Sequence, residues 1–227
     1  MALSTTDLGK EGGSGLPKTI APGNHRLKIN SVFLEDFKFI EGAKHLVMNV
    51  ETEPIDGFQG FMIDKDDESK GHHEGQIGKL KASQYAFADG KTKSGIPIKR
   101  DRSILMFLQN MCKAVGANDW FISQNDKHET IEEFVEAFNT DAPFKGRYFD
   151  CCVAGKEYEG KSGYTNYDMW IPKGNKDGGY AFGCIGDKIL AYDETQHLKK
   201  LETKTVEGFG DDDFDVPSKA ASNFSLD

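Results

Sequence analysis

Two segments in the first quarter of the chain alternate apolar and polar residues with a period of two, the pattern of a strand that buries one face. The alternation is imperfect over His25 to Leu34 and regular over Lys44 to Glu53, where every second side chain from Leu46 to Thr52 shares one face. The turn dipeptide Asp56-Gly57 then leads into a third apolar run, Phe58 to Asp64. We expect these three segments to pair as an antiparallel meander.

A helical section follows the strands. Apolar residues from Ile104 to Val115 recur on one helical face, and Asp101 or Ser103 is expected to cap the start of this helix. A second helix is expected to begin at Thr130, because Glu133 stands three residues later and completes a capping box. Helical periodicity therefore interrupts the strand patterns near the middle of the chain.

Two further strands are predicted over Arg147 to Val153 and Tyr164 to Ile171, with a short helix around Glu194 to Leu201. Three strands, a helical section and two strands is the element order of the OB-fold, a five-stranded and partly open barrel. Other small β-barrels and α+β domains can share this order. We expect a mainly β protein: an OB-fold-like, five-stranded antiparallel barrel with a helix between its third and fourth strands.

The ends of the chain differ in composition from its middle. Residues 1–22 are rich in Gly, Ser, Thr and Pro without periodicity, which predicts a flexible arm. Residues 23–206 are expected to form the domain, with a long insertion at 65–100 that carries many charges and glycines. Long loops of this kind are often functional. Residues 207–227 are too polar to pack and are expected to be a disordered acidic tail.

Charge is distributed unevenly in this chain, whose formal net charge is -9. Residues 207–227 hold six acids and one base, whereas residues 76–103 hold seven bases and two acids. A protein that is acidic overall can therefore present a basic surface to a polyanion.

The composition places the chain among globular proteins that do not enter membranes. Hydrophobic residues make up 37% of its 227 residues, and no apolar run approaches the ~20 residues of a membrane span. The first residues lack the basic and apolar regions of a signal peptide. The four cysteines have no C-x-x-C spacing, so we expect reduced thiols and a cytoplasmic location.

Aromatic residues fall at informative positions in the last two predicted strands. Tyr148, Tyr164 and Trp170 lie on the more polar face of these strands, where a large ring needs a reason. Stacking on nucleic-acid bases is one reason, and burial beneath residues 116–144 or 172–206 is the other. Trp120, near the end of the first helix, is expected to be structural.

The segments that border the ligand site of an OB-fold carry rings and bases together in this chain: the loops at 35–43 and 154–163 and, beside them, the insertion. Cations bind the phosphates of a nucleic-acid backbone, and aromatic rings stack on its unpaired bases. This combination suits the binding of single-stranded nucleic acid without sequence preference. The candidate stacking residues are Phe37, Phe39, Tyr85, Phe87, Tyr148, Tyr158, Tyr164 and Trp170. The candidate phosphate contacts are Lys38, Lys79, Lys81, Lys91, Lys93, Lys99, Arg100, Arg147, Lys156 and Lys161.

Two other motifs point to chemistry that their context does not favour. Gly155 to Ser162 matches the Walker A pattern, but a strand pattern follows where a P-loop needs a helix. The cluster from Asp64 to His73 offers carboxylate and imidazole groups without a standard ligand spacing, so a solvated acidic loop is its ordinary interpretation. We expect no catalytic residues, no resident metal and no cofactor.

The expected tail combines an acidic run with aromatic residues: Asp211, Asp212, Asp213, Phe214, Asp215 and Phe224. With the expected barrel and the basic, aromatic loops, the chain resembles single-stranded DNA-binding proteins, particularly those of bacteriophages. The stretch from Phe144 through Tyr158 to Tyr167 is similar to the final hairpin of such proteins. The chain departs from the bacterial pattern in the residues that follow the acids and in its end, Phe-Ser-Leu-Asp.

This resemblance implies a non-catalytic, sequence-tolerant protein that coats and protects single-stranded DNA in phage replication or recombination, within the host cytoplasm. It also implies that the acidic tail recruits replication and recombination proteins. Two alternatives remain open at this point. One is a metal-dependent nuclease that uses the cluster from Asp64 to His73, and the other is a β-barrel that binds proteins and no nucleic acid.

Overall fold

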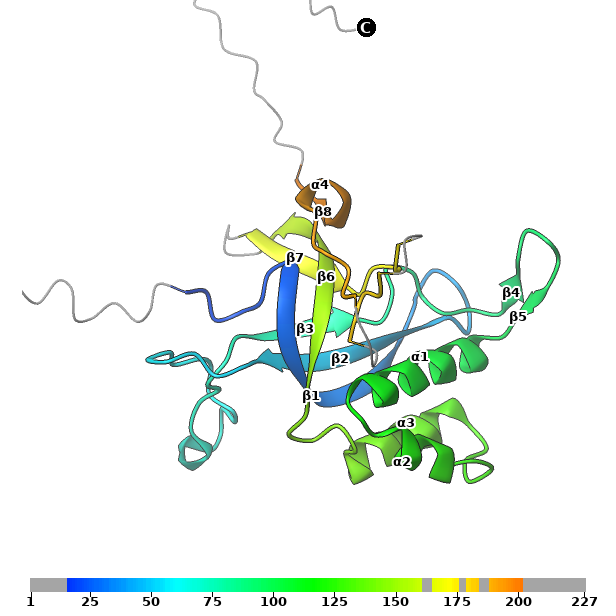
Figure 1. Ribbon diagram of the computed structural model, residues 1–227, viewed down its shortest axis with the longest axis horizontal. Helices are drawn as coiled ribbons and strands as arrows, with labels where there is room; N and C mark the ends of the chain where they lie inside the picture. The colour runs from blue at the N-terminus through cyan, green and yellow to red at the C-terminus, as the bar shows by residue number, and fades with distance from the viewer. Residues whose placement is uncertain (1–15, 161–164, 176–178, 184–187, 202–227) are drawn as a thin grey trace, which may run out of the picture.

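The computed structural model describes residues 16–160, 165–175, 179–183 and 188–201, and Figure 1 shows its strands wrapped around one core. The barrel strands are β1 (Gly23–Asp36), β2 (Lys44–Thr52), β3 (Ile77–Lys81), β6 (Tyr148–Glu159) and β7 (Thr165–Trp170). They are neighbours in the order β1-β2-β3-β7-β6, and β6 pairs back with β1 to close the barrel. β3 and β7 run parallel, and the other pairs are antiparallel. The expected OB-fold-like barrel is confirmed.

The alternation predicted for the first two strands matches the side chains that the barrel buries. Met48 of β2 and Leu27 of β1 are fully buried, and the core extends through their inward-facing neighbours. The register of β1 against β2 shifts between Ile29 and Ser31, which is a β-bulge. This extra residue explains why the alternation of β1 is imperfect, and Val32 returns to the core beyond it.

The third strand does not lie where the sequence predicted it. Phe58 to Asp64 forms no strand, and the third barrel strand is Ile77–Lys81, within the predicted insertion. Its period of two is hidden because the inward position before Leu80 is Gly78. Ile20 fills the space there, and a Cβ on Gly78 would lie 2.4 Å from Ile20 Cγ1.

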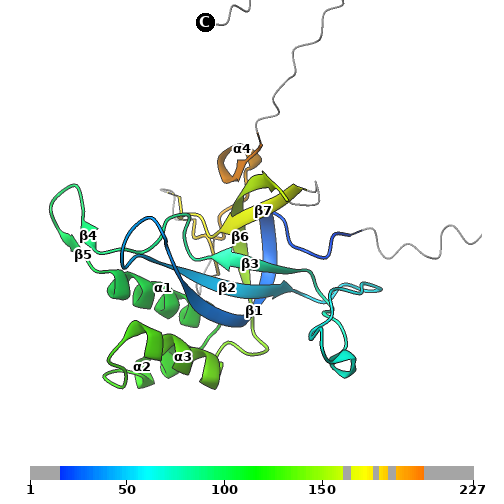
Figure 2. The ribbon, with the colours of Figure 1, turned by 180° about the vertical axis from the view of Figure 1, so that it is seen from behind.

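The predicted insertion at 65–100 is therefore two excursions separated by β3. The first, residues 53–76, contains the 3₁₀ turn η1 (Glu68–Lys70) and projects from the barrel in cyan in Figure 1. The second, residues 82–99, contains the small hairpin of β4 (Gly90–Lys91) and β5 (Pro97–Ile98). Figures 1 and 2 show this hairpin projecting on the opposite side of the molecule.

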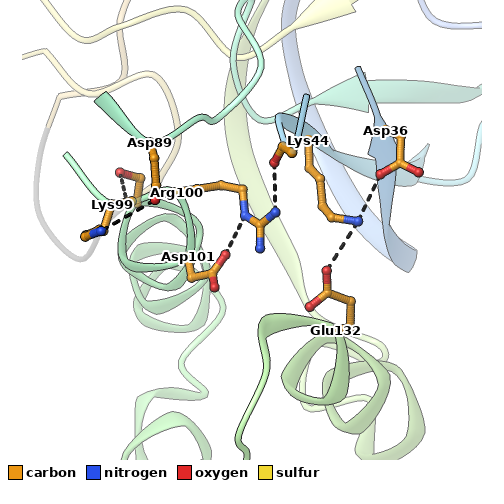
Figure 3. Close-up of polar contacts among 9 residues, drawn as sticks. Asp36, Lys44, Asp89, Lys99, Arg100, Asp101 and Glu132 are labelled. Atoms are coloured by element: carbon orange, nitrogen blue, oxygen red, sulfur yellow. Dashed lines mark hydrogen bonds and ion pairs between the residues drawn. The ribbon is translucent and has the colours of Figure 1, made fainter. Parts of the chain in front are cut away.

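Three helices lie together beside the barrel, on the side opposite α4 and the β6–β7 hairpin in Figure 1: α1 (Arg100–Ala114), α2 (Asn118–Ser123) and α3 (Ile131–Asp141). The predicted capping box of α3 is confirmed, because Thr130 Oγ1 accepts a hydrogen bond from the Glu133 N–H at 3.2 Å. The predicted cap of α1 is wrong, since neither Asp101 nor Ser103 precedes the helix. The carboxylate of Asp89, eleven residues earlier, accepts from the Arg100 N–H at 2.8 Å instead (Figure 3).

Side-chain contacts fix this helical layer internally and against the barrel. Trp120 packs edge-on against Phe138 with ring centroids 5.3 Å apart, and its indole N–H donates to Asp141 at 2.8 Å. Asn139 of α3 bonds both backbone groups of Val32 in β1, accepting from its N–H at 2.8 Å and donating to its carbonyl. The expectation that Trp120 is structural is confirmed.

The C-terminal part of the described chain lies on the outside of β6. It ends in α4 (Glu194–His197) and β8 (Leu198–Lys199), and β8 pairs in parallel with β6. Asn24 at the start of β1 holds this segment by two bonds, donating to the Leu190 carbonyl at 2.9 Å and accepting from the Tyr192 N–H at 2.7 Å.

At the N-terminal end, the ordered structure begins earlier than the predicted boundary at residue 22. Ile20 is only 1% exposed, and its N–H donates to the Ile77 carbonyl at 3.0 Å. The rest of the predicted arm, residues 1–15, and the predicted tail lie outside the described residues. Among the described residues, no helix is long and apolar enough to span a bilayer.

Candidate functional site

A groove of about 540 Å³ opens on the barrel surface between β3 and the β6–β7 hairpin. β3 and β7 pair over only two positions, Leu80 with Met169 and Lys81 with Trp170, and the two strands separate beyond them. This separation leaves the space that the groove occupies. The groove is lined by Glu35, Val47, Lys79, Lys81, Lys156, Tyr158, Tyr167, Asp168 and Met169.

Three lysines supply positive charge to the groove. Lys81 forms an ion pair with Asp168 at 2.8 Å, and Lys79 lies 3.9 Å from a carboxylate oxygen of Glu35. Within the described part of the chain, Lys156 has no ion-pair partner. Ion pairs at a protein surface are worth little, about 0–1 kcal/mol, so an incoming phosphate can replace these carboxylates. The groove can therefore hold an anionic chain.

Aromatic rings stand beside these cations. Tyr158 is 47% exposed on β6, and Tyr167 of β7 is half-buried across the same hairpin. Phe33 of β1 is also half-buried, with the Lys79 ammonium 5.3 Å from its ring centroid. Exposed rings between cations can stack on the bases of a strand whose phosphates the cations bind.

A second hollow, of about 430 Å³, adjoins the groove because Lys79 lines both. Its other walls include the polar side chains of Asn30, Ser31, Asn49 and His73, and Asn49 donates to Ser31 Oγ at 2.8 Å. The groove and this hollow therefore meet at Lys79 of β3.

A buried carboxylate supports one wall of this second hollow. Glu51 is 4% exposed and accepts hydrogen bonds from His73 Nδ1 at 3.0 Å and Asn30 Nδ2 at 3.2 Å, while the Lys28 ammonium lies 3.2 Å away. Burial opposes ionisation, but the bonds from His73 and Asn30 and the charge of Lys28 outweigh it and lower the pKa of Glu51. The carboxylate therefore fixes His73, and with it the first excursion, to β2.

His45, next to the groove in β2, is held neutral at physiological pH. Burial and the positive charge of Lys81 lower the pKa of its imidazole, against the smaller opposite effects of Asp168 and Glu35. The ring of Phe37 packs edge-on against His45 at 5.3 Å and against Phe39 at 5.4 Å. Phe39 itself is 87% exposed, so the loop at 35–43 presents one free ring.

Several predicted contact residues lie elsewhere. Arg100 donates to Asp101 at 2.6 Å and to the Gly42 carbonyl at 2.8 Å, which ties the β1–β2 loop to α1 (Figure 3). Arg147 donates to the carbonyls of Val115 and Gly116 at the end of α1. Both guanidinium groups therefore have structural partners outside the groove.

The remaining predicted residues divide by location. Phe87 is half-buried and packs against the core, while Tyr148 lies at the far end of β6 from Tyr158. The others are exposed outside the groove, on the loop at 35–43, after β3, and on or beside the β4–β5 hairpin: Lys38, Tyr85, Lys91, Lys93 and Lys99. Lys161, Tyr164 and the tail residues lie outside the described residues.

Trp170 is a correction to the sequence analysis. Its ring was expected on an open face, but the structure leaves it 8% exposed. Residues of the later chain lie around it, namely Pro172, Lys173, Gln196, His197 and Lys199, and the Lys199 ammonium lies 5.9 Å from the ring centroid. The alternative raised from the sequence, burial beneath the segment at 172–206, is confirmed by those of its residues that the structure describes.

The motifs that pointed to other chemistry have structural explanations. Gly155 to Glu159 is strand, and Thr165 onward is strand again, so the described part of the Walker A look-alike belongs to a hairpin. In the acidic excursion, the Lys70 ammonium forms ion pairs with Asp64 at 2.6 Å and with Asp67 at 3.9 Å. No three potential metal-binding side chains converge anywhere in the described ranges.

Sequence reasoning missed some of the groove. Tyr167 alternates with Met169, which predicts the core face of the strand, and it does pack against the core; the separation of β7 from β3 also leaves its ring on the lining of the groove. The alternation of the first strand groups Phe33 with Leu27 and Ile29, but the β-bulge between Ile29 and Ser31 turns it to the other face, where its ring lies 5.3 Å from the Lys79 ammonium beside the groove. The bulge and the position of the third strand are the signals that would have placed it.

Comparison of the chain with models of known protein families, with curated proteins and with solved structures finds no match. The functional argument therefore depends on the groove itself.

Proposed function

We propose that this protein binds single-stranded DNA without strong sequence preference and without catalysis. The observation that supports the proposal most directly is the groove, where Lys79, Lys81 and Lys156 lie among the rings of Tyr158 and Tyr167. Lysines that line a groove can bind the phosphates of a backbone that runs along it, and the rings can stack on bases that are free of a duplex.

The shape and chemistry of the groove favour a flexible single strand. Stacking platforms require splayed, unpaired bases, and a rigid duplex keeps its bases inside. Stacking also accepts any base, so we expect weak discrimination among sequences. In the cell, such a protein would coat exposed strands during phage replication or recombination and recruit partner proteins through its acidic tail.

Titration of fluorescein-labelled oligonucleotides tests this proposal. We expect single-stranded DNA to bind more tightly than a duplex of the same sequence, with affinity falling as salt rises, at a log-log slope of about -0.7 per phosphate contact. Equal or tighter duplex binding would contradict the proposal. The same titration with RNA measures the preference between the two nucleic acids.

A charge-matched pair of triple variants locates the binding surface. Replacing Lys79, Lys81 and Lys156 by alanine should weaken binding and lower the salt slope by about 2, because about 0.7 is lost per phosphate contact. The control replaces three exposed lysines outside the groove, Lys65, Lys127 and Lys145. Equal losses in both variants would indicate nonspecific attraction to net charge and would argue against the groove.

A further inference from the structure

Trp170 and the segment that covers it form a third hollow, of about 270 Å³. Tyr85 stands on its rim with 70% of its surface exposed, and Lys173 and Lys199 line it as well. The hollow is smaller than the ~300–1,000 Å³ of sites for drug-sized ligands. Gln196, His197 and Lys199 of the covering segment form part of its lining, so this volume belongs to the covered state, and the indole wall beneath them suits one planar ring system.

The sheet register places this hollow on the same face as the groove. Trp170 pairs with Lys81 of β3, and Lys156 pairs with Asp168 two residues before Trp170. Residues two apart on a strand share a face, so Trp170 follows Asp168 along the groove face. On β6, the residue opposite Trp170 is Ala154, whose small side chain lets Lys199 of β8 reach across to the indole.

The cover over Trp170 is held by few contacts. β8 pairs with β6 at two positions only, Gly155 with Leu198 and Lys156 with Lys199. One further bond, from the Leu201 N–H to Glu157 at 3.0 Å, follows it along β6. Of residues 194–201, His197 alone is buried and Leu198 is half-buried, while the others are exposed. Short elements with so little buried surface open at low free-energy cost. Residues 194–201 can therefore leave the barrel without unfolding it.

We propose that the hollow over Trp170 is a closed binding site for a single nucleobase, and that the segment at 194–199 is its gate. This inference rests on the proposed function, because the base belongs to the strand that occupies the groove. When β8 leaves β6, the indole face now beneath the Lys199 ammonium becomes free to stack on a base. Lys173, on the lining of the hollow, can then bind the backbone phosphate of the same nucleotide, and Tyr85 stands at the entrance.

The gate couples the C-terminal segment to DNA binding. Single-stranded DNA and residues 194–199 compete for the ring of Trp170. The affinity for DNA therefore falls as the fraction of molecules with a closed gate rises. A partner that binds the C-terminal segment and removes it from β6 therefore raises the affinity of the protein for single-stranded DNA. This competition acts through a folded contact at Trp170 and does not depend on the charge of the tail.

The gate can be tested without DNA, by acrylamide quenching of Trp170 fluorescence in the full chain. The Trp170 signal is the difference between each protein and its Trp170→Phe counterpart, which removes the contribution of Trp120. We expect Leu198→Pro, which blocks strand pairing at β8, to make Trp170 accessible, with an unchanged urea midpoint showing that the barrel remains folded. Accessibility equal to that of the parent would overturn the gate.

A second pair of variants tests the site with a dT oligonucleotide. Lys199→Ala removes the ammonium from the indole and is expected to raise the Trp170-dependent affinity about two- to fivefold, the equivalent of a partly exposed cation–π contact. Lys200→Ala is the matched control, because Lys200 pairs with Glu194 and does not line the hollow. It should leave the affinity unchanged, and equal effects of the two variants would overturn the assignment.

The outcomes separate this inference from the proposed function. If Leu198→Pro exposes Trp170 and the oligonucleotide quenches the Trp170 fluorescence, the base site and the proposed function are both supported. If the oligonucleotide binds through the groove lysines but never quenches an exposed Trp170, the base site is wrong and the proposed function stands. If no oligonucleotide binds, the proposed function and the base site are both wrong, whether or not acrylamide reaches Trp170.

Discussion

At the scale of single residues, Tyr158 is the groove ring with the most exposed surface that the β6–β7 hairpin presents. Tyr158→Ala removes one stacking platform and should weaken single-stranded DNA binding by about 5- to 150-fold, because one stacked base is worth about 1–3 kcal/mol. Tyr158→Phe keeps the ring and should bind almost as the parent does. Fluorescence anisotropy titrations at one fixed salt concentration measure both.

Tyr180 provides the matched control for this prediction. It is 56% exposed and lies outside the groove. Tyr180→Ala should leave the affinity within experimental error of the parent. If the losses at Tyr158 and Tyr180 are equal, the groove assignment at β6 is wrong.

Glu51 carries a pH-dependent part of the stability. Its pKa in the folded protein lies below the ordinary value of 4.5, so the charged form stabilises the fold above that value. This contribution is lost as the pH falls through the lowered, folded-state pKa. Glu51→Gln should reduce the free energy of unfolding at pH 7 by about 1.5–3 kcal/mol, the worth of a hydrogen bond to a charged group.

Urea unfolding at pH 7 and at pH 3 checks this prediction. The parent should lose more stability than Glu51→Gln between these two values, because the variant has no carboxylate to protonate at this position. The same loss in both proteins would show that other acids account for the acid sensitivity. Glu74→Gln is the control, because Glu74 is exposed within the same first excursion, and its loss of stability between the two pH values should match that of the parent.

Some residue chemistry was predictable from the sequence even where the strand was not. Lys79 and Lys81 were named as contacts although β3 was not predicted, and Lys156 and Tyr158 were assigned to a loop at 154–163, whereas both lie on β6 and line the groove. Trp170 was assigned to the right strand, but its cover comes from β8, some thirty residues later in the chain. Local periodicity contains no information about such a distant contact.

At the scale of elements, β3 depends on a glycine. A side chain at Gly78 would meet Ile20 Cγ1 at 2.4 Å and Met169 Cε at 3.1 Å. Gly78→Ala must therefore displace the buried Ile20, and we expect a loss of about 1–3 kcal/mol of stability from overpacking. Thermal unfolding should show a lower Tm, by about 2–4 °C for each kcal/mol lost.

Gly90 in β4 is the control for this substitution. A Cβ there would meet no atom within 4 Å, so Gly90→Ala should change the free energy of unfolding by less than ~0.5 kcal/mol. Equal Tm values for Gly78→Ala and the parent would mean that Ile20 is not fixed against β3. The two variants together separate a local packing effect from the general effect of replacing glycine.

The elements that the sequence predicted well are those with an unbroken period. β2, α1 and α3 each keep their apolar spacing over several turns or residues, and each was placed within a few residues. β3 has five residues, of which the inward pair are Gly78 and Leu80, so it has almost no period to detect. α1 was found although its cap was not, because Asp89 reaches the helix from a distant excursion.

At the scale of the whole molecule, charge separates along the chain. Residues 207–227 hold six acids and one base, and the groove holds three lysines. A tethered acidic segment containing Phe214 and Phe224 resembles a strand of phosphates and bases, so we expect it to compete with DNA for the groove. Tethering gives it a high effective concentration, although each individual contact is weak and screened by salt.

Removing residues 207–227 should therefore strengthen single-stranded DNA binding, most visibly at low salt, where screening is least. Paired salt titrations of the full chain and the shortened chain measure the difference. The two curves should converge as the Debye length shortens from about 30 Å at 0.01 M salt to about 3 Å at 1 M. A variant with Phe214 and Phe224 replaced by alanine keeps every acid, so it isolates the part of the competition that comes from the rings. Equal affinities at every salt concentration would rule out competition, because a segment that occupies the groove must weaken DNA binding when it is present, and would leave the tail as a docking peptide for partner proteins or as a solubilising segment.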